Sequence, residues 1–255
     1  MQSRAEPTID TPDGLVHLAS GRPGRLTVLD HHRWHRDRLI PESLLMLLAQ
    51  QVARSGAMIV HGAAIRIGDQ GMLVLGGRGS GKSILSAAAL AAGCQVVSDD
   101  WLLLGHDSAG RLVAERLRDF LMWRRGWATD QLLHVLCESG FELQERRKRV
   151  LFIAEQSVAR LNQLPEAVEI RRLCLLKRPR GARTTRSSIF ELTQGQAMAA
   201  LIEATVPALF TKQFAAERAA LLNTSLSLLT LGPFALCSGV DLVTDPSKAL
   251  ARLME

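Results

Sequence analysis

The most informative segment of the chain is Gly76-Gly77-Arg78-Gly79-Ser80-Gly81-Lys82-Ser83, which matches the pattern G-x-x-x-x-G-K-[ST] at every specified position. The segment follows an apolar run, Met72-Leu73-Val74-Leu75, and precedes a helix-forming run from Ile84 to Ala92. This order predicts a strand, a glycine-rich loop and a helix, with the backbone N–H groups of the loop surrounding a di- or triphosphate. We therefore predict an α/β fold that binds a nucleotide.

Individual residues of this segment match the chemistry of phosphate binding. Lys82 can reach the β and γ oxygens of a nucleotide, and the Ser83 hydroxyl can bind Mg²⁺. Glycines allow positive φ angles and close approach of the backbone. The expected nucleotide contacts are Gly76, Gly77, Arg78, Gly79, Ser80, Gly81, Lys82, Ser83 and Ile84. The alternative is a glycine-rich turn that binds nothing.

Two carboxylates follow soon after the loop. A helix from Ser83 to Ala92, stopped by Gly93, and a strand from Cys94 to Val97 lead to Asp99 and Asp100, and Asp99 lies only 17 positions after Lys82. One helix of about three turns therefore returns the chain to the loop. Adjacent strand residues point to opposite faces, so the two carboxylates are expected to differ in role unless the chain is already turning. One can hold Mg²⁺ while the other faces an incoming hydroxyl; the alternative is an ordinary Asp-Asp turn or helix cap.

Together with His61-Gly62 upstream, these motifs resemble the catalytic domain of HPr kinase/phosphorylase and the metal-binding core of phosphoenolpyruvate carboxykinase. His61 lies 21 residues before Lys82, and the interval predicts a hairpin of residues 63–67 and 72–75 around a turn at 68–71. The resemblance covers about residues 40–105. Barely sixty residues precede His61, which leaves no room for the regulatory domain of the full enzymes, and residues 115–126 match their downstream glycine-rich signature poorly. The chain is thus similar to the compact HPr-kinase-like proteins, and phosphorylase activity is not implied.

The resemblance implies a central mixed sheet flanked by helices, with ATP and Mg²⁺ as cofactors. Lys82 would hold the phosphates, Ser83 and Asp100 the metal, and His61 would lie beside the transferring phosphoryl group. Asp99 would be the base that takes a proton from the acceptor hydroxyl. Compact members of this family are associated with serine phosphorylation of proteins and with tailoring of ribosomally made peptides such as lasso peptide precursors.

The implied activity is therefore that of an ATP-dependent serine kinase acting on a peptide or protein. Two alternatives stay open, a small-metabolite phosphotransferase on the same fold and a non-catalytic nucleotide-binding regulator. A mechanical ATPase is excluded by the short spacing to Asp99.

Three basic clusters are further candidates for phosphate or acceptor contacts. By the resemblance, Lys148 or Arg149 would reach the nucleotide phosphates, although a solvated run of charge explains them equally well. Residues 177–186 carry five cations in ten positions and predict a loop that could steer an acidic peptide or protein to the site. Arg124 and Arg125 form the third cluster. Nucleic acid is not an expected partner, because the basic clusters lack interleaved aromatic residues despite a net charge of +6.

The length of the chain predicts one large domain, or one domain with a small appendage. The chain has 255 residues, of which 47% are hydrophobic and 22% charged, enough for a core and too few charges for disorder. We expect N-terminal strands and a linker at 1–40, packing on a catalytic domain at 41–255. Four scattered cysteines without a C-x-x-C pair predict reduced thiols, and no signal peptide or membrane span is recognisable. These features predict a soluble, cytoplasmic protein without a membrane partner, and a homo-oligomer is left open.

Periodicity and turn residues predict the remaining elements. The expected strands are short edge strands at 15–16 and 26–28, strands at 101–104, 111–114 and 150–153, and a hairpin of 171–177 with 187–192. The expected helices are 41–54, 129–140, one capped by Thr193 that runs to Val206, and 210–222.

Overall fold

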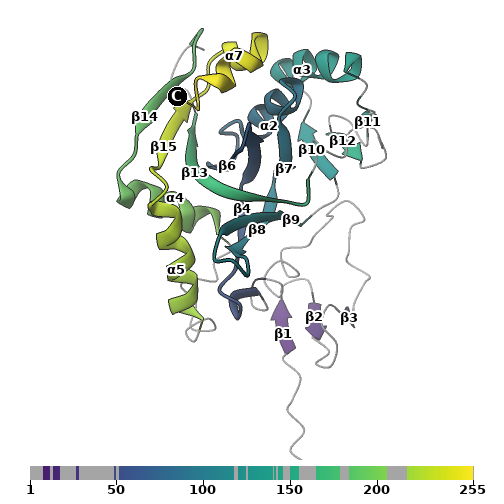
Figure 1. Ribbon diagram of the computed structural model, residues 1–255. Helices are drawn as coiled ribbons and strands as arrows, with labels where there is room; N and C mark the ends of the chain where they lie inside the picture. The colour runs from purple at the N-terminus through teal and green to yellow at the C-terminus, as the bar shows by residue number, and fades with distance from the viewer. Residues whose placement is uncertain are drawn as a thin grey trace, which may run out of the picture.

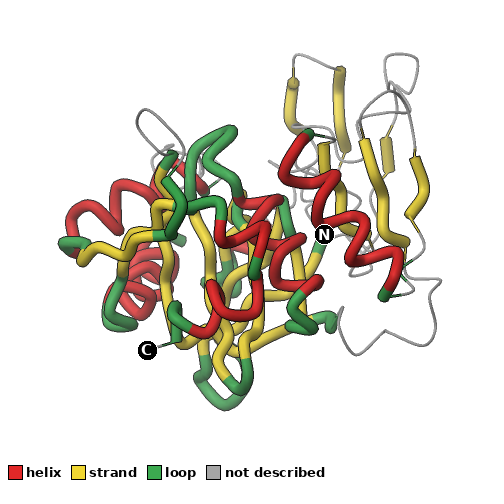
Figure 2. The backbone as a smooth tube through the Cα atoms, turned by 90° about the horizontal axis from the view of Figure 1, so that it is seen from above, coloured by secondary structure: helices red, strands yellow, loops and turns green. Residues whose placement is uncertain are grey.

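The computed structural model describes residues 8–11, 14–17, 27–28, 49, 52–117, 120–124, 126–139, 141, 143–145, 150–154, 165–178, 184–205 and 217–254. Its largest feature is a nine-stranded mixed sheet with helices on both faces (Figures 1 and 2). The sheet order is β4-β8-β9-β13-β6-β5-β7, and β15 pairs with β13 and β14. This arrangement confirms an α/β fold with a central mixed sheet flanked by helices.

The strands of this sheet are β4 (Met58–His61), β5 (Ala63–Ile67), β6 (Gln70–Leu75), β7 (Gln95–Ser98), β8 (Trp101–His106), β9 (Leu112–Arg116), β13 (Ala167–Lys177), β14 (Ser188–Glu191) and β15 (Phe234–Cys237). Its helices are α2 (Lys82–Ala91), α3 (Trp127–Glu138), α4 (Gln194–Ala204), α5 (Arg218–Leu229), α6 (Asp241–Thr244) and α7 (Pro246–Ala251). A three-stranded sheet of β10 (Phe120–Arg124), β12 (Val150–Ala154) and β11 (Leu143–Glu145) is separate.

Successive side chains of the buried strands point to opposite faces of the sheet, and this divides the core into two layers. In β6, Met72 and Val74 pack on one face with α2, α3, α6 and α7, whereas Leu73 and Leu75 pack on the other with α4 and α5. All four of these side chains are fully buried, so β6 lies at the centre of the molecule. The loop that follows β6 therefore starts from a rigid strand.

Four strands of the sheet run in the same direction, so the loops that follow them lie at the same edge. Both β13 and β15 run parallel to β6, and β7 shares this direction because β6 and β7 are each antiparallel to β5. The loops after β6, β7, β13 and β15 consequently leave at the same edge. In open α/β sheets, ligands bind at this carboxyl edge.

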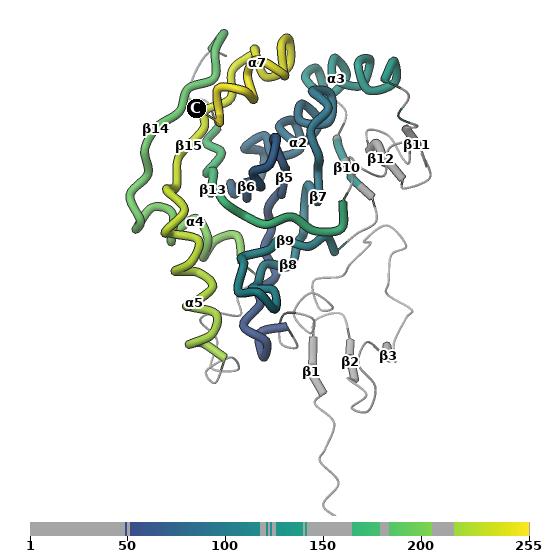
Figure 3. Tube along the Cα trace, viewed as in Figure 1, coloured from purple at the N-terminus to yellow at the C-terminus, as the bar shows by residue number. Residues whose placement is uncertain are grey.

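Strand β13 joins the two parts of the nine-stranded sheet, and its long course can be followed in Figure 3. Residues Ala167 to Glu169 pair with β9, and the strand pairs with β6 from Ile170 onward. Where β13 meets β6, a Cβ on Gly71 would lie 2.1 Å from the Glu169 carbonyl oxygen, so glycine is required for this close approach.

Many local predictions are confirmed. The hairpin of β5 and β6, the helix α2 and the strands β7, β8, β9 and β12 lie within a few residues of their predicted bounds. Helix α3 begins at Trp127, two residues before its predicted start. Thr193 caps α4 through a capping box with Gln196, and the helix ends at Ala204 rather than Val206.

Three predictions need correction. Strands β13 and β14 do not form a hairpin, because β15 lies between them and pairs with both. The helix expected at 210–222 is described only from Arg218, and it continues to Leu229. The N-terminal strands β1 (Thr8–Thr11), β2 (Gly14–His17) and β3 (Thr27–Val28) form a sheet of their own rather than edges of the main sheet.

Some predictions fall outside the described residues, including most of the helix at 41–54 and most of the linker before it. No helix in the described part of the chain has the length and apolar content needed to cross a bilayer.

Candidate functional site

The glycine-rich segment forms the loop between β6 and α2. Three of its glycines have positive φ angles, 154° at Gly76, 77° at Gly79 and 108° at Gly81, which other residues rarely adopt. Gly81 is the N-cap of α2 and has no side chain that could cap the helix, and Gly81, Lys82 and Ser83 of this helix start line the cleft beside the loop. Such a helix start attracts anions through its N–H groups and its dipole.

Lys82 lies at the start of α2 with its ammonium group turned back onto the loop. Its Nζ donates to the carbonyl oxygen of Gly76 at 2.6 Å and lies 3.5 Å from that of Gly77. Burial lowers the pKa of Lys82 below its usual value of 10.5, while the negative charge of Asp100 opposes this shift. The ammonium group is therefore poorly solvated. A phosphate that binds to it would displace few water molecules.

The two carboxylates lie in the tight connection between β7 and β8. The Ser98 hydroxyl donates to the Trp101 carbonyl at 2.8 Å and accepts from the Asp100 amide at 3.4 Å, which closes the turn. Asp99 is only 5% exposed, although it lines the cleft beside the loop. Because the chain turns here, both carboxylates face the same cleft rather than opposite faces of a strand.

His61 ends β4 and lies directly beside this turn. Its Nε2 is 3.0 Å from Asp100 Oδ1, and its ring packs against Trp101 with 4.9 Å between the ring centroids. The amide of Gly62 donates to the Asp100 carbonyl at 2.7 Å. The pairing of β4 with β8 places His61 opposite Trp101, so the hydrogen-bonded ladder itself sets the contact between His61 and Asp100.

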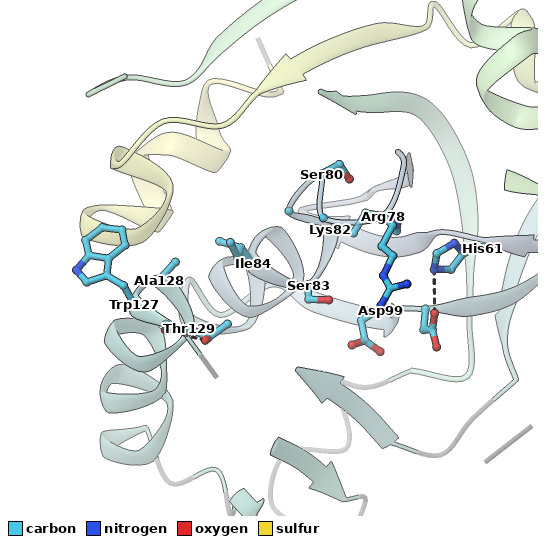
Figure 4. A pocket seen from close by; sticks show the side chains of 14 residues that line it. His61, Arg78, Ser80, Lys82, Ser83, Ile84, Asp99, Trp127, Ala128 and Thr129 are labelled. Carbon is cyan, nitrogen blue, oxygen red and sulfur yellow. Dashed lines mark hydrogen bonds and ion pairs between the residues drawn. The ribbon is translucent and has the colours of Figure 1, made fainter. Parts of the chain in front are cut away.

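These groups surround one open cleft of about 750 Å³ (Figure 4). His61 and Asp99 lie on one side of Ser83, and Ile84, Ala128 and Trp127 lie on the other. The cleft is lined by His61, Arg78, Gly79, Ser80, Gly81, Lys82, Ser83, Ile84, Asp99, Asp100, Gly126, Trp127, Ala128 and Thr129. Its volume falls in the range usual for small-ligand sites.

The structure brings together most of the residues that the sequence singled out. Arg78 to Ile84 line the cleft with His61, Asp99 and Asp100, while Gly76 and Gly77 contribute the carbonyl groups that meet Lys82. Lys148, Arg149 and Arg125 lie outside the described residues, and only the backbone of Arg124 is described, in β10.

Sequence reasoning missed the first turn of α3, from Gly126 to Thr129, which lines the same cleft. The Thr129 hydroxyl donates to the Gly126 carbonyl at 2.9 Å and holds this turn closed. Periodicity predicts that the helix starts at Thr129, and this predicted start excludes Trp127. The sequence signal that could have revealed this start is Gly126 followed by the large aromatic residue Trp127.

The side chains present fit a magnesium ion better than a metal that needs many protein ligands. In the described part of the chain no three His, Cys, Asp or Glu side chains converge as a metal site. Mg²⁺ commonly uses one or two carboxylates together with phosphate oxygens and water. Asp100, oriented by His61, and the Ser83 hydroxyl lie in the same cleft and suit that requirement.

Comparison with known proteins adds little to this description. No protein-family model matches the chain, and no curated protein matches it. Among solved structures, the HPr(Ser) kinase/phosphatase from Coxiella burnetii matches with a TM-score of 0.32 and 19% sequence identity, over 48% of this chain and 66% of that one. A match at this TM-score supports no argument about fold or activity, so the functional proposal rests on the cleft itself.

Proposed function

We propose that this chain is an ATP-dependent kinase that transfers a phosphoryl group to the hydroxyl of a serine in a peptide or protein. The observation that supports it is the meeting of a glycine-rich phosphate loop, a lysine and two carboxylates in one cleft. A binding protein needs the loop and the lysine. The additional carboxylates suit the transfer chemistry, which requires both metal binding and a group that accepts a proton.

In this proposal the chain acts mainly through positioning and charge. The loop amides and Lys82 hold the β- and γ-phosphates, and Ser83 and Asp100 hold Mg²⁺, which supplies positive charge against the phosphate oxygens when it is bound. The acceptor oxygen forms a bond to the γ-phosphorus, and the bond from this phosphorus to the β–γ bridging oxygen breaks. ADP leaves with the electron pair of that bond, and Asp99 takes the proton of the acceptor hydroxyl.

His61 has a positioning role in this scheme. Its hydrogen bond to Asp100 fixes the orientation of that carboxylate, and its packing on Trp101 limits rotation of the imidazole. A metal-binding carboxylate held in this way loses less freedom when the ion binds.

The test separates nucleotide binding from transfer. Lys82→Ala should weaken Mg·ATP binding and abolish transfer, because a cation that binds phosphate is lost. Asp99→Asn should leave ATP affinity nearly intact and slow transfer by about 100-fold or more, since a positioned general base contributes about this much. Isothermal titration measures the affinity of each variant for Mg·ATP. Transfer of radiolabelled phosphate to acidic serine-containing peptides, with free serine as a comparison acceptor, measures the transfer rate.

Asp107→Asn is the matched control, because it makes the same chemical change in an exposed turn between β8 and β9. It should alter neither binding nor transfer. Full transfer activity in Asp99→Asn would reject that residue as the base. Transfer to free serine but to no peptide would favour the small-metabolite phosphotransferase, and ATP binding without any transfer would favour a regulator.

A further inference from the structure

The cleft beside the phosphate loop has two chemically different ends. At one end are His61 and Asp99. Asp100 lines the same cleft and lies 3.0 Å from His61, so three side chains that can carry charge meet there. At the other end the lining is Ile84, Ala128, Trp127 and Thr129 (Figure 4). This end is mainly apolar, and its polar groups are the indole N–H and the Thr129 hydroxyl, which donates to the Gly126 carbonyl. The proposed transfer chemistry uses the polar end and the loop, and it leaves the apolar end without a role.

Trp127 is an unusual residue to find at this position. Its side chain is 45% exposed, and of the large apolar side chains that are exposed in the described residues it is the one that lines this cleft. Single exposed apolar residues are common on protein surfaces and need no explanation. An exposed indole at the wall of a ligand-sized cleft is different, because aromatic rings are frequent ligand contacts in such clefts.

The position of Trp127 is set by buried packing. Leu132, Leu133 and Leu136 of α3 are buried in the same core layer as Leu85 and Ala88 of α2, and Ala128 packs against this layer. The helix that carries Trp127 is therefore fixed to the helix that starts at the phosphate loop. A ligand that bridges the two helices would meet a preformed surface.

The order of groups along the cleft predicts which end would hold the γ-phosphate of a bound nucleoside triphosphate and which end would hold its base. If the γ-phosphoryl group lies near Asp99 and the β- and γ-phosphates meet Lys82 and Ser83, the α-phosphate lies toward Ile84 at the next position of α2. The nucleoside then leaves the loop on the side of Ala128 and Trp127, away from His61. The apolar end is thus where the base arrives.

We propose that Trp127, with Ile84 and Ala128 beside it, is the binding surface for the base of the nucleotide and makes the site selective for purines. This inference rests on the proposed function, because it assumes that the loop binds a nucleoside triphosphate. Stacking of a base on an aromatic side chain tolerates different bases, and its strength grows with the overlap of the two ring systems. The two fused rings of a purine cover more of an indole than the single ring of a pyrimidine does.

The test compares ligands that share phosphates and differ in the base. Mg·ATP, Mg·CTP and inorganic tripolyphosphate are titrated into the wild-type protein, Trp127→Ala and Trp127→Phe. Wild type should bind ATP more tightly than CTP. Trp127→Ala should weaken ATP binding about tenfold, in line with the loss of one base–aromatic stack, and should reduce the preference for ATP over CTP. Trp127→Phe should keep most of the ATP affinity, and tripolyphosphate should bind all three proteins equally.

Val135→Ala is the matched control, since Val135 is also exposed on α3 but does not line the cleft. Its ATP affinity should equal that of wild type. Unchanged ATP affinity in Trp127→Ala would overturn the inference. An equal loss of tripolyphosphate affinity would also overturn it, because Trp127 would then shape the phosphate site rather than contact a base. If wild type binds neither ATP nor tripolyphosphate, the proposed function itself fails.

Discussion

The buried position of Lys82 in the cleft destabilises the fold. Lys82 is 7% exposed, and burial lowers its pKa, so the positive charge is destabilised where it lies. The Gly76 carbonyl and the charge of Asp100 offset only part of this penalty. Residues that bind ligands often lower the stability of the free protein, because their charge is neutralised only when the ligand is bound.

We therefore expect Lys82→Met to stabilise the ligand-free protein. Methionine keeps the length of the side chain and removes the buried charge. The free energy of unfolding at pH 7 should rise by about 1 kcal/mol, a typical gain from a single stabilising substitution. Urea denaturation in the absence of nucleotide measures this change.

The pH dependence of the same comparison provides a check. The pKa of Lys82 is lower in the folded protein than the usual 10.5, which applies to the unfolded chain. At pH values between the folded-state pKa and 10.5, the unfolded chain therefore binds more protons than the folded protein. Wild-type stability should then rise with pH in this window, and the advantage of Lys82→Met should shrink toward pH 10.5. A lower stability of Lys82→Met at pH 7 would show that the bond to Gly76 outweighs the burial of the charge.

At the scale of helices and strands, the loop before β14 is tied to the C-terminal helices through Asp241. Its carboxylate accepts from the amide and hydroxyl of Ser187, at 2.9 and 2.7 Å, and pairs with Arg252. Burial alone would raise the pKa of Asp241, but these hydrogen bonds and the charge of Arg252 outweigh it and hold the pKa below 3.8. The end of the basic segment is thereby fixed to α6.

Asp241→Ala should lower the free energy of unfolding at pH 7 by about 1–3 kcal/mol, because the partly buried donors of Ser187 and Arg252 lose their acceptor. The contribution of Asp241 is complete above pH 3.8 and is lost as the pH falls through its lower folded-state pKa, so the difference from wild type should shrink in that range. Urea denaturation at pH 7 and pH 3 measures both effects. Asp107→Ala is the control, since Asp107 also bonds backbone and Arg111 but lies in an exposed turn, where the loss should be smaller. Equal losses in the two variants would contradict the argument.

The elements that could be predicted from the sequence are those specified locally. The hairpin of β5 and β6, helix α2 and the turn with Asp99 each depend on turn residues and periodicity within about 40 positions. The pairing of β15 with both β13 and β14 could not be predicted, because β15 starts at Phe234, more than forty residues after the end of β14 at Glu191, and lies between the two strands. Trp127 was missed for a related reason, since only the packing of α3 on α2 brings it to the cleft.

At the scale of the whole molecule, the described cations Lys177 and Arg178 lie at the end of β13, at the edge of the sheet where the candidate site lies. The basic segment of residues 177–186 follows β13, which runs parallel to β6, so it starts at the same edge as the phosphate loop. Leu176 confirms the proximity, since its carbonyl oxygen would lie 2.7 Å from a Cβ on Gly76. Residues 179–183 lie outside the described part, whereas Lys177, Arg178 and Arg186 are exposed.

If this segment guides an acidic acceptor, changing Arg178, Arg180, Arg183 and Arg186 together to Ser should raise KM for an acidic serine peptide about tenfold at low salt. KM for ATP should not change. The effect should weaken as salt is added, because exposed charges are screened over about 8 Å at physiological ionic strength. Steady-state kinetics at low and physiological salt measure this.

The matched control changes Arg54 and Arg218 to Ser. Both are exposed and lie near the contact of Gly56 with Ala220, beyond the start of β4 and thus at the opposite end of that strand from His61. Peptide kinetics should be the same as in wild type. An unchanged peptide KM in the four-fold variant at low salt would remove the segment from acceptor recognition.

The pairing of β6 with β13 also has a consequence during protein synthesis. Leu73 in β6 lies beside Leu173 in β13, about one hundred residues later in the chain. At about 5–20 residues per second, a ribosome needs about 5–20 seconds to supply that partner after β6 has emerged. Throughout this interval one edge of an apolar strand is unpaired, a state that favours association between chains. The glycine-rich loop therefore emerges from the ribosome well before the strand that carries it is paired on both sides.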